Sequence, residues 1–121
     1  MRYVDGYVLA VSKKNLKAYK KMAADAGKTW MKCGALSYTE AIEEDLTTAK
    51  QWGGYPFQDT VKAKKDEVIV FSYIVYKSRK HRDQVNAKVH KHMSDSKYKD
   101  IPMPFDMKRM AYGGFETFVE L

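Results

Sequence analysis

The chain of 121 residues has a formal net charge of +7, with 45% hydrophobic and 13% aromatic residues. These values are typical of a single globular domain over residues 1–121 and exclude a disordered chain. No apolar run approaches the roughly 20 residues of a membrane span, and the acid and glycine at Asp5 and Gly6 argue against a signal peptide, so we expect no membrane partner. The single cysteine, Cys33, excludes an internal disulfide and favours a reduced, cytoplasmic setting.

The positive charge is spread along the chain instead of being gathered in one tract. Basic residues occur on both predicted helices and in the turn at Lys62–Lys65, and acids are interleaved with them. This distribution favours solvated helix faces over a specific polyanion site. We therefore do not expect nucleic acid as a partner.

The first half of the chain predicts a strand followed by a helix. Side chains alternate from Tyr3 to Val11, which is typical of a strand. Ser12 offers an N-cap oxygen to a helix that starts near Lys13 and runs to Cys33, with apolar residues at three- and four-residue spacing. Gly34 follows as a C-cap.

The remainder of the chain predicts three more strands and a second helix. The strands are expected at Ala35–Leu46, Glu67–Tyr76 and Met107–Leu121, and the helix after Ser78; Thr47–Val61 is irregular. The order β-α-β-β-α-β predicts an α+β fold, a ferredoxin-like half-barrel whose antiparallel sheet has both helices on one face.

The strand Glu67–Tyr76 is apolar on both faces, which a small sheet with one helical layer does not explain. Alternation places Val68, Val70, Ile74 and Tyr76 on one face and Ile69, Phe71, Tyr73 and Val75 on the other. The second face needs a cover, and burying even ~600 Å² of it is worth roughly 15 kcal/mol before the costs of association. We therefore expect a homodimer that packs sheet against sheet.

Three blocks of the sequence stand out: YVDGYVL at residues 3–9, VFSYIVYKSRKHRDQVNAKV at residues 70–89 and MPFDMKRMAYGGF at residues 103–115. Together they resemble a YbaA-like bacterial family of unknown function, within the dimeric α+β barrel superfamily. The resemblance implies the same fold and the same dimer. Superfamily relatives include cofactor-free monooxygenases, haem-degrading enzymes, small isomerases and ligand-sensing domains, and fold alone does not choose among them.

In such barrels a pocket usually lies between the sheet and the helices, and the second helix supplies candidate catalytic groups. His81 lies about 40° from the line of Val85 in the first helical turn, where the helix dipole favours neutral imidazole that can take a proton or orient a ligand. The alternative is a boundary histidine bonded to a backbone carbonyl. Asn86 could donate to a substrate oxygen, or it could bond a loop carbonyl.

Candidate ligand-binding residues are arginines and aromatic residues. Arg82 and Arg109 could grip a carboxylate by bidentate pairing, or they could pair with nearby acids of the protein. Trp30, Tyr38 and Tyr73 could line a pocket for a flat ring, or they could simply belong to the core.

The segment from Lys50 to Phe57 carries Trp52 and two further aromatic residues around Gly53 and Gly54. Glycine hinges and apolar area are what a lid over a cavity needs. A dimer-contact loop explains the same residues equally well.

No motif for a metal, nucleotide or other cofactor is found, and His90 and His92 lie about 200° apart on a helix, so we expect no metal and no cofactor. The sequence therefore predicts a cytoplasmic dimer that binds a small aromatic or acidic organic molecule. It could be a cofactor-free monooxygenase or isomerase that uses His81 and Asn86. The alternative is a non-catalytic ligand-binding or interaction dimer.

Overall fold

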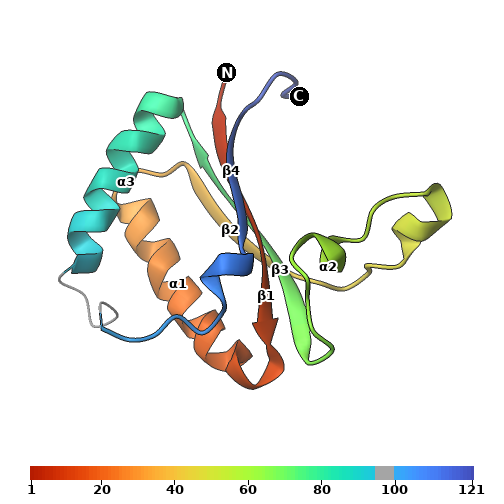
Figure 1. Ribbon diagram of the computed structural model, residues 1–121. Coiled ribbons are helices and arrows are strands. Elements are labelled where there is room, and N and C mark those ends of the chain that lie inside the picture. The colour runs from red at the N-terminus through yellow and green to blue at the C-terminus, as the bar shows by residue number, and fades with distance from the viewer. Residues whose placement is uncertain (95–99) are drawn as a thin grey trace.

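The computed structural model describes residues 1–94 and 100–121 and shows an α+β fold built on one antiparallel sheet (Figure 1). The strands lie in the order β2-β3-β1-β4. Their bounds are Tyr3–Ser12 for β1, Ser37–Ile42 for β2, Glu67–Tyr76 for β3 and Ala111–Glu116 for β4. The long helices are α1 (Leu16–Lys32) and α3 (Arg79–Ser94); the short helical turns are η1 (Lys13–Asn15), η2 (Thr48–Trp52), α2 (Phe57–Thr60) and η3 (Met107–Arg109). The predicted α+β class is confirmed.

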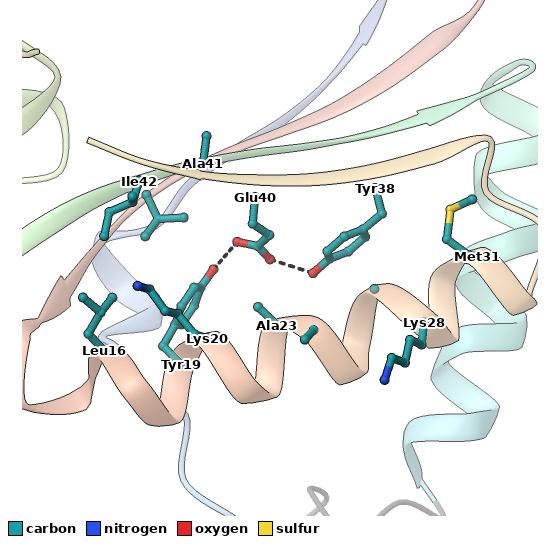
Figure 2. Close-up of a pocket in the computed structure, with 13 residues that line it drawn as sticks. Leu16, Tyr19, Lys20, Ala23, Lys28, Met31, Tyr38, Glu40, Ala41 and Ile42 are labelled. Carbon is teal, nitrogen blue, oxygen red and sulfur yellow. Dashed lines mark hydrogen bonds between the residues drawn. The ribbon is translucent and has the colours of Figure 1, made fainter. Parts of the chain in front are cut away.

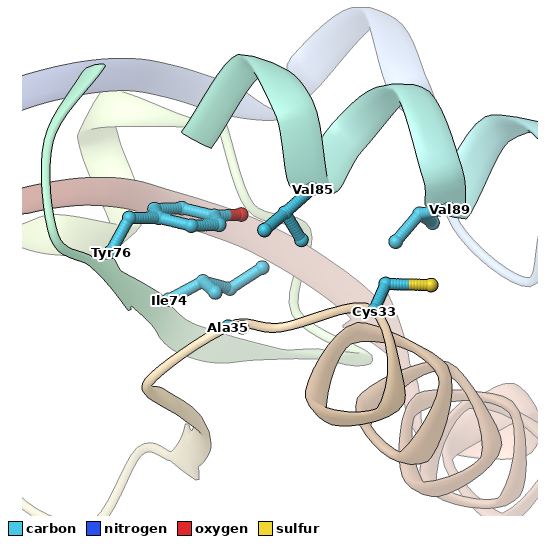
Figure 3. Close-up of a cluster of buried hydrophobic side chains, with 6 residues drawn as sticks. All are labelled: Cys33, Ala35, Ile74, Tyr76, Val85 and Val89. Atoms are coloured by element: carbon cyan, nitrogen blue, oxygen red, sulfur yellow. The ribbon is translucent and has the colours of Figure 1, made fainter. Parts of the chain in front are cut away.

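The helices α1 and α3 cover one face of the sheet (Figure 1). On β3 the side chains of Val70, Ile74 and Tyr76 are buried on this face. Figure 3 shows that Ile74 and Tyr76 meet Cys33 from the end of α1 and two valines of α3. Cys33 is thus a packing residue, as its place at the end of a helix predicts.

The opposite face of the sheet is covered only in part, by the chain between β2 and β3 (Figure 1). Val61 packs there against Ala10 and Ile69. Phe71 and Phe115, on the same face, are 43% and 62% exposed. The two-sided apolar pattern of Glu67–Tyr76 therefore corresponds to a helix-covered face and a face that this chain leaves partly open.

The helix α1 ends in a glycine cap at Gly34, as the sequence predicts. Gly34 has a φ of +115°, and its N–H donates to the carbonyl of Met31, while the Ala35 N–H donates to the carbonyl of Trp30. These two bonds form the Schellman arrangement, which satisfies the last carbonyls of the helix. The same turn occupies Ala35, so β2 begins later than predicted.

The beginning of this helix and the ends of two strands differ from the sequence prediction. Ser12 makes no side-chain capping bond, because β1 continues through it and the chain enters η1 before α1 begins at Leu16. The strand β2 ends before Asp45, whose carboxylate accepts from the backbone N–H groups of Thr47 and Thr48 and closes a turn. In the described residues, no helix is long and apolar enough to cross a membrane.

Candidate functional site

An inner cavity of about 340 Å³ lies between the sheet and the helices. The described residues of its wall are mainly aromatic residues, methionines and small apolar residues, and one of them carries a carboxylate. The lining residues that matter below are Tyr7, Tyr19, Ala26, Trp30, Tyr38 and Glu40, together with Met22, Met93, Met103 and Met110. Such a wall suits a flat apolar molecule.

A second hollow, the outer groove, has a volume of about 710 Å³ and runs between α1 and the edge strand β2 (Figure 2). Lys20, Ala24 and Lys28 line the outer groove but not the inner cavity. Tyr19, Ala23, Tyr38 and Glu40 line both hollows. These four residues therefore lie where the two hollows meet.

Glu40 is held between two tyrosines (Figure 2). Tyr19 of α1 donates its hydroxyl hydrogen to Oε1 at 2.5 Å, and Tyr38 of β2 donates to Oε2 at 2.6 Å. Burial, and secondly the hydrogen bond to Glu40, raise the pKa of both tyrosines well above the ordinary value. Both hydroxyls therefore stay protonated and act as donors to the carboxylate.

Backbone geometry brings this bridge together. Tyr38 and Glu40 share one face of β2, since they pair with Ile74 and Ser72 on the helix-covered side of β3. The ring of Tyr38 lies directly against α1 at Gly27, where an added Cβ would fall 2.8 Å from Cδ1 of the ring. Glycine at this position allows the close approach of β2 to the helix.

A second polar cluster surrounds Asp5, which is fully buried on the helix-covered side of β1. Nη1 of Arg82 donates to Oδ1 of Asp5 at 2.8 Å and to the hydroxyl of Tyr112 at 2.8 Å, while Nε donates to Asp83. Burial raises the pKa of Asp5, and the positive charge of Arg82 counteracts this effect. The cluster ties β1, β4 and α3 together.

The two predicted catalytic residues both make hydrogen bonds to the protein itself. Nδ1 of His81 accepts from the backbone N–H of Lys77 at 3.0 Å, and the His81 N–H donates to Oγ of Ser78. His81 is thus a helix-start residue, bonded to a backbone N–H and not to the carbonyl that the sequence suggested as its alternative partner. Ser78 thus caps the start of α3 with its side-chain oxygen.

The amide oxygen of Asn86 accepts from Nε1 of Trp30 at 3.2 Å and from the hydroxyl of Tyr76 at 3.3 Å. These bonds fasten α3 to α1 and β3. Asn86 does not line the inner cavity.

Of the predicted ligand-binding residues, the structure brings Trp30 and Tyr38 together in the wall of the inner cavity, with ring centroids 5.9 Å apart. Arg82 instead makes the ion pair with the buried Asp5, with 12% of its side chain exposed. A buried protein carboxylate thus takes the place of the predicted ligand carboxylate.

The other three predicted residues lie away from the inner cavity. Trp52 is 84% exposed on η2. Tyr73 contacts Phe71 on the partly open face, because it has the opposite parity on β3 from the core residues. Arg109 makes a bidentate pair with Glu67, at 2.8 and 2.7 Å.

Sequence reasoning did not single out Glu40, Tyr19 or Asp5 as site residues. A signal for both acids was present, because each occupies an inward position in an otherwise apolar or aromatic alternation. An acid at such a position must be buried or half-buried, and it then needs a partner. Among the described residues, no group of three or more His, Cys, Asp and Glu side chains is placed to hold a metal ion.

Comparison with known proteins places the chain in a family. Residues 2–107 match the family described as "Protein of unknown function (DUF1428)". The chain is 42% identical over 122 residues to the uncharacterized protein YbaA of Escherichia coli K12 and, at the same identity, to YbaA of Shigella flexneri, covering 99% of each chain. A de novo designed protein, Foldit4, superposes with a TM-score of 0.47 at 9% identity, over 97% of this chain and 99% of its own. The chain belongs to the YbaA-like bacterial family of unknown function that the sequence blocks indicated.

Proposed function

We propose that this protein is a cytoplasmic homodimer that binds a small, flat and largely apolar organic molecule in the inner cavity. The observation that carries the proposal is the cavity itself, with about 340 Å³ of space behind an aromatic and methionine-rich wall. Small-molecule sites are of this size and composition, with few polar groups that fix the orientation of the ligand. The bridge of Tyr19, Glu40 and Tyr38 supplies such groups.

The dimer part of the proposal is supported by the partly open face of the sheet. The strand order β2-β3-β1-β4 fits a ferredoxin-like half-barrel, and α1 and α3 leave the face with Phe71 and Phe115 without a helical cover. A second copy that packs its own open face there would complete a dimeric α+β barrel. Phe57 stacks edge-on against Phe71, at 6.0 Å between ring centroids, so the segment 50–57 lies beside this face. Its position favours a dimer contact over a lid for the inner cavity.

A catalytic function is the second candidate, and Glu40 favours it. A carboxylate in an apolar cavity can take a proton from a bound molecule, as a cofactor-free monooxygenase or isomerase requires. Glu40 replaces His81 and Asn86 as the residue that would touch the substrate. His81 and Asn86 then act as positioning residues that hold α3 against the core.

The test is native mass spectrometry of freshly purified protein, run gently and then with collisional activation. Two variants of α1 separate the hollows: Ala26→Leu fills the inner cavity alone, and Ala24→Leu changes the outer groove alone. We expect wild type and Ala24→Leu to be dimers that release a small molecule on activation, and Ala26→Leu to be an empty dimer. A titration with the fluorescent probe N-phenyl-1-naphthylamine should show the same pattern, with affinity lowered about 10-fold or more only in Ala26→Leu.

A clean monomer would contradict the dimer. Equal ligand occupancy in Ala26→Leu and wild type would contradict the inner cavity as the site. A wild-type dimer that is empty and does not bind the probe would contradict ligand binding altogether.

A further inference from the structure

The described part of the inner cavity's wall contains one charged group. Among the described residues that line it, Glu40 is the only acid, and none is a lysine, arginine or histidine. Every other side chain of the wall is aromatic, aliphatic or sulfur-containing, apart from the hydroxyl of Ser72. The charge of Glu40 therefore sets the polarity of the whole cavity.

No cation of the described chain is paired with this carboxylate. The nearest candidates by position, Lys20 and Lys28, line the outer groove on the other side of the bridge, and neither forms an ion pair with Glu40. The contrast is Asp5, whose charge is met by Arg82 at 2.8 Å. A carboxylate in apolar surroundings without a cation is costly to keep, so a ligand that brings a positive charge is stabilised there.

The two tyrosines hold the carboxylate without neutralising it. Each oxygen of Glu40 accepts one hydroxyl hydrogen, and a carboxylate oxygen has room for a second donor. Because the pKa values of Tyr19 and Tyr38 are raised, both tyrosines stay protonated and act as neutral donors to Glu40. The bridge thus presents a fixed carboxylate with free acceptor capacity.

The wall around the carboxylate is also suited to a cation. The ring centroids of Trp30 and Tyr38 lie 5.9 Å apart, with the two rings tilted. Tyr7, which also lines the cavity, stacks on Tyr112. Aromatic faces attract ammonium groups, most strongly where water is excluded. An anionic ligand would face the carboxylate, and the described residues of the wall offer it no compensating positive charge.

We infer that the inner cavity selects a small organic ammonium ion, with an aromatic or other apolar body that fills the wall and one protonated amine that pairs with Glu40. This inference rests on the proposed function, since it names the class of ligand that the inner cavity takes. The sequence analysis expects an aromatic or an acidic ligand, and this inference favours the aromatic one.

The test uses three probes of one shape and different charge: 2-naphthylmethylammonium, 2-naphthalenemethanol and 2-naphthoate. Their dissociation constants are measured by isothermal titration calorimetry with the purified, ligand-free protein. We expect the ammonium to bind about 10-fold more tightly than the alcohol and about 100-fold more tightly than the carboxylate, because a charged hydrogen bond to Glu40 adds to the same ring contacts. In Glu40→Gln the ammonium and the alcohol should bind within about 3-fold of each other.

The outcomes separate the inference from the proposed function. If the ammonium and the alcohol bind wild type equally, or the carboxylate binds best, and Ala26→Leu weakens all three, the cavity binds ligands but the inference of a cation is wrong. If none of the three binds wild type, both the inference and the proposed function are contradicted. The order of the three affinities in wild type shows whether the cavity prefers a cation, even if Glu40→Gln does not fold.

Discussion

The carboxylates of Asp5 and Glu40 both point into the helix-covered side of the sheet, but their surroundings are opposite in charge. Asp5 on β1 is fully buried and is paired with Arg82 of α3. Glu40 on β2 is half-buried between α1 and the edge of the sheet, and within the described residues its hydrogen bonds come from the hydroxyls of Tyr19 and Tyr38. The charge of Asp5 is compensated by Arg82, whereas no cation among the described residues pairs with Glu40.

The difference indicates which of the two is structural. A compensated buried charge gives the fold its connections, because removing either partner leaves the other alone in a low-dielectric interior. An uncompensated charge that lines a cavity is a poor stabiliser and a good site for a partner that arrives from solution. On this reasoning Asp5 fixes the packing of α3, and Glu40 is the residue that we propose to meet a ligand.

The largest expected effect comes from breaking the compensated pair. Arg82→Met should lower the free energy of unfolding by about 3–5 kcal/mol, because it leaves the carboxylate of Asp5 buried without a cation. The measurement is urea denaturation followed by circular dichroism at a fixed protein concentration, since the stability of the proposed dimer would depend on concentration.

Two further variants control this measurement. Arg79→Met, at the exposed first position of α3, should change stability by no more than about 0.5 kcal/mol. Adding Asp5→Asn to Arg82→Met should recover part of the loss, because the orphaned charge is then removed. If Arg82→Met is as mild as Arg79→Met, the ion pair is not what holds α3.

The pH dependence of stability extends the comparison to another carboxylate, that of Glu67. Arg109 donates two hydrogen bonds to it and lowers its pKa from 4.5 to about 2. Between these values the unfolded chain takes up a proton that the folded chain does not, so stability is lost as the pH falls from about 4.5 towards 2. For Asp5 the sign is opposite, because burial raises its pKa above 3.8 and its contribution becomes less favourable as the pH rises through that raised value.

We therefore expect Glu67→Gln to be less stable than wild type by about 2 kcal/mol at pH 7, and the difference to vanish near pH 2. Urea denaturation at several pH values between 2 and 7 gives both curves. Asp59→Asn, an exposed acid of α2, serves as the control and should run parallel to wild type throughout. A constant difference in the free energy of unfolding between Glu67→Gln and wild type down to pH 2 would show that Arg109 does not bind the carboxylate of Glu67.

The fold was largely predictable because its signals are local. The strand at Glu67–Tyr76 was expected with the bounds that the structure shows, since its apolar residues, interrupted only by Ser72, lie between a charged turn and the Lys77–Ser78 pair. The end of α1 at Gly34 was marked by the only residue type that adopts a φ of +115° without strain. The error at Ser12 arose because strand pairing to Glu67 outweighed a capping preference worth about 1 kcal/mol.

The site was less predictable because it depends on partners far apart in the sequence. Arg82 was a good candidate for binding a carboxylate, but the carboxylate belongs to Asp5, 77 positions away. Tyr73 and Tyr38 look alike as aromatic residues in strands, and only the pairing register sends one to the partly open face and the other to the cavity. Glu40 was expected within the strand at Ala35–Leu46 but was not considered as a site residue, although its parity places it on the same side as Tyr38.

The smallest expected effect on stability tests the uncompensated member of the pair. Glu40→Gln keeps the shape of the side chain, its amide oxygen still accepts from one tyrosine, and its amide N–H can donate to the hydroxyl oxygen of the other. Since an unpaired charge is removed at the same time, ligand-free protein should change its free energy of unfolding by about 1 kcal/mol or less. The measurement is the same urea denaturation, with Tyr38→Phe as a control that removes one donor and leaves the charge. A loss in Glu40→Gln as large as that in Arg82→Met would mean that the protein itself compensates Glu40, and the reason to expect a cationic ligand would disappear.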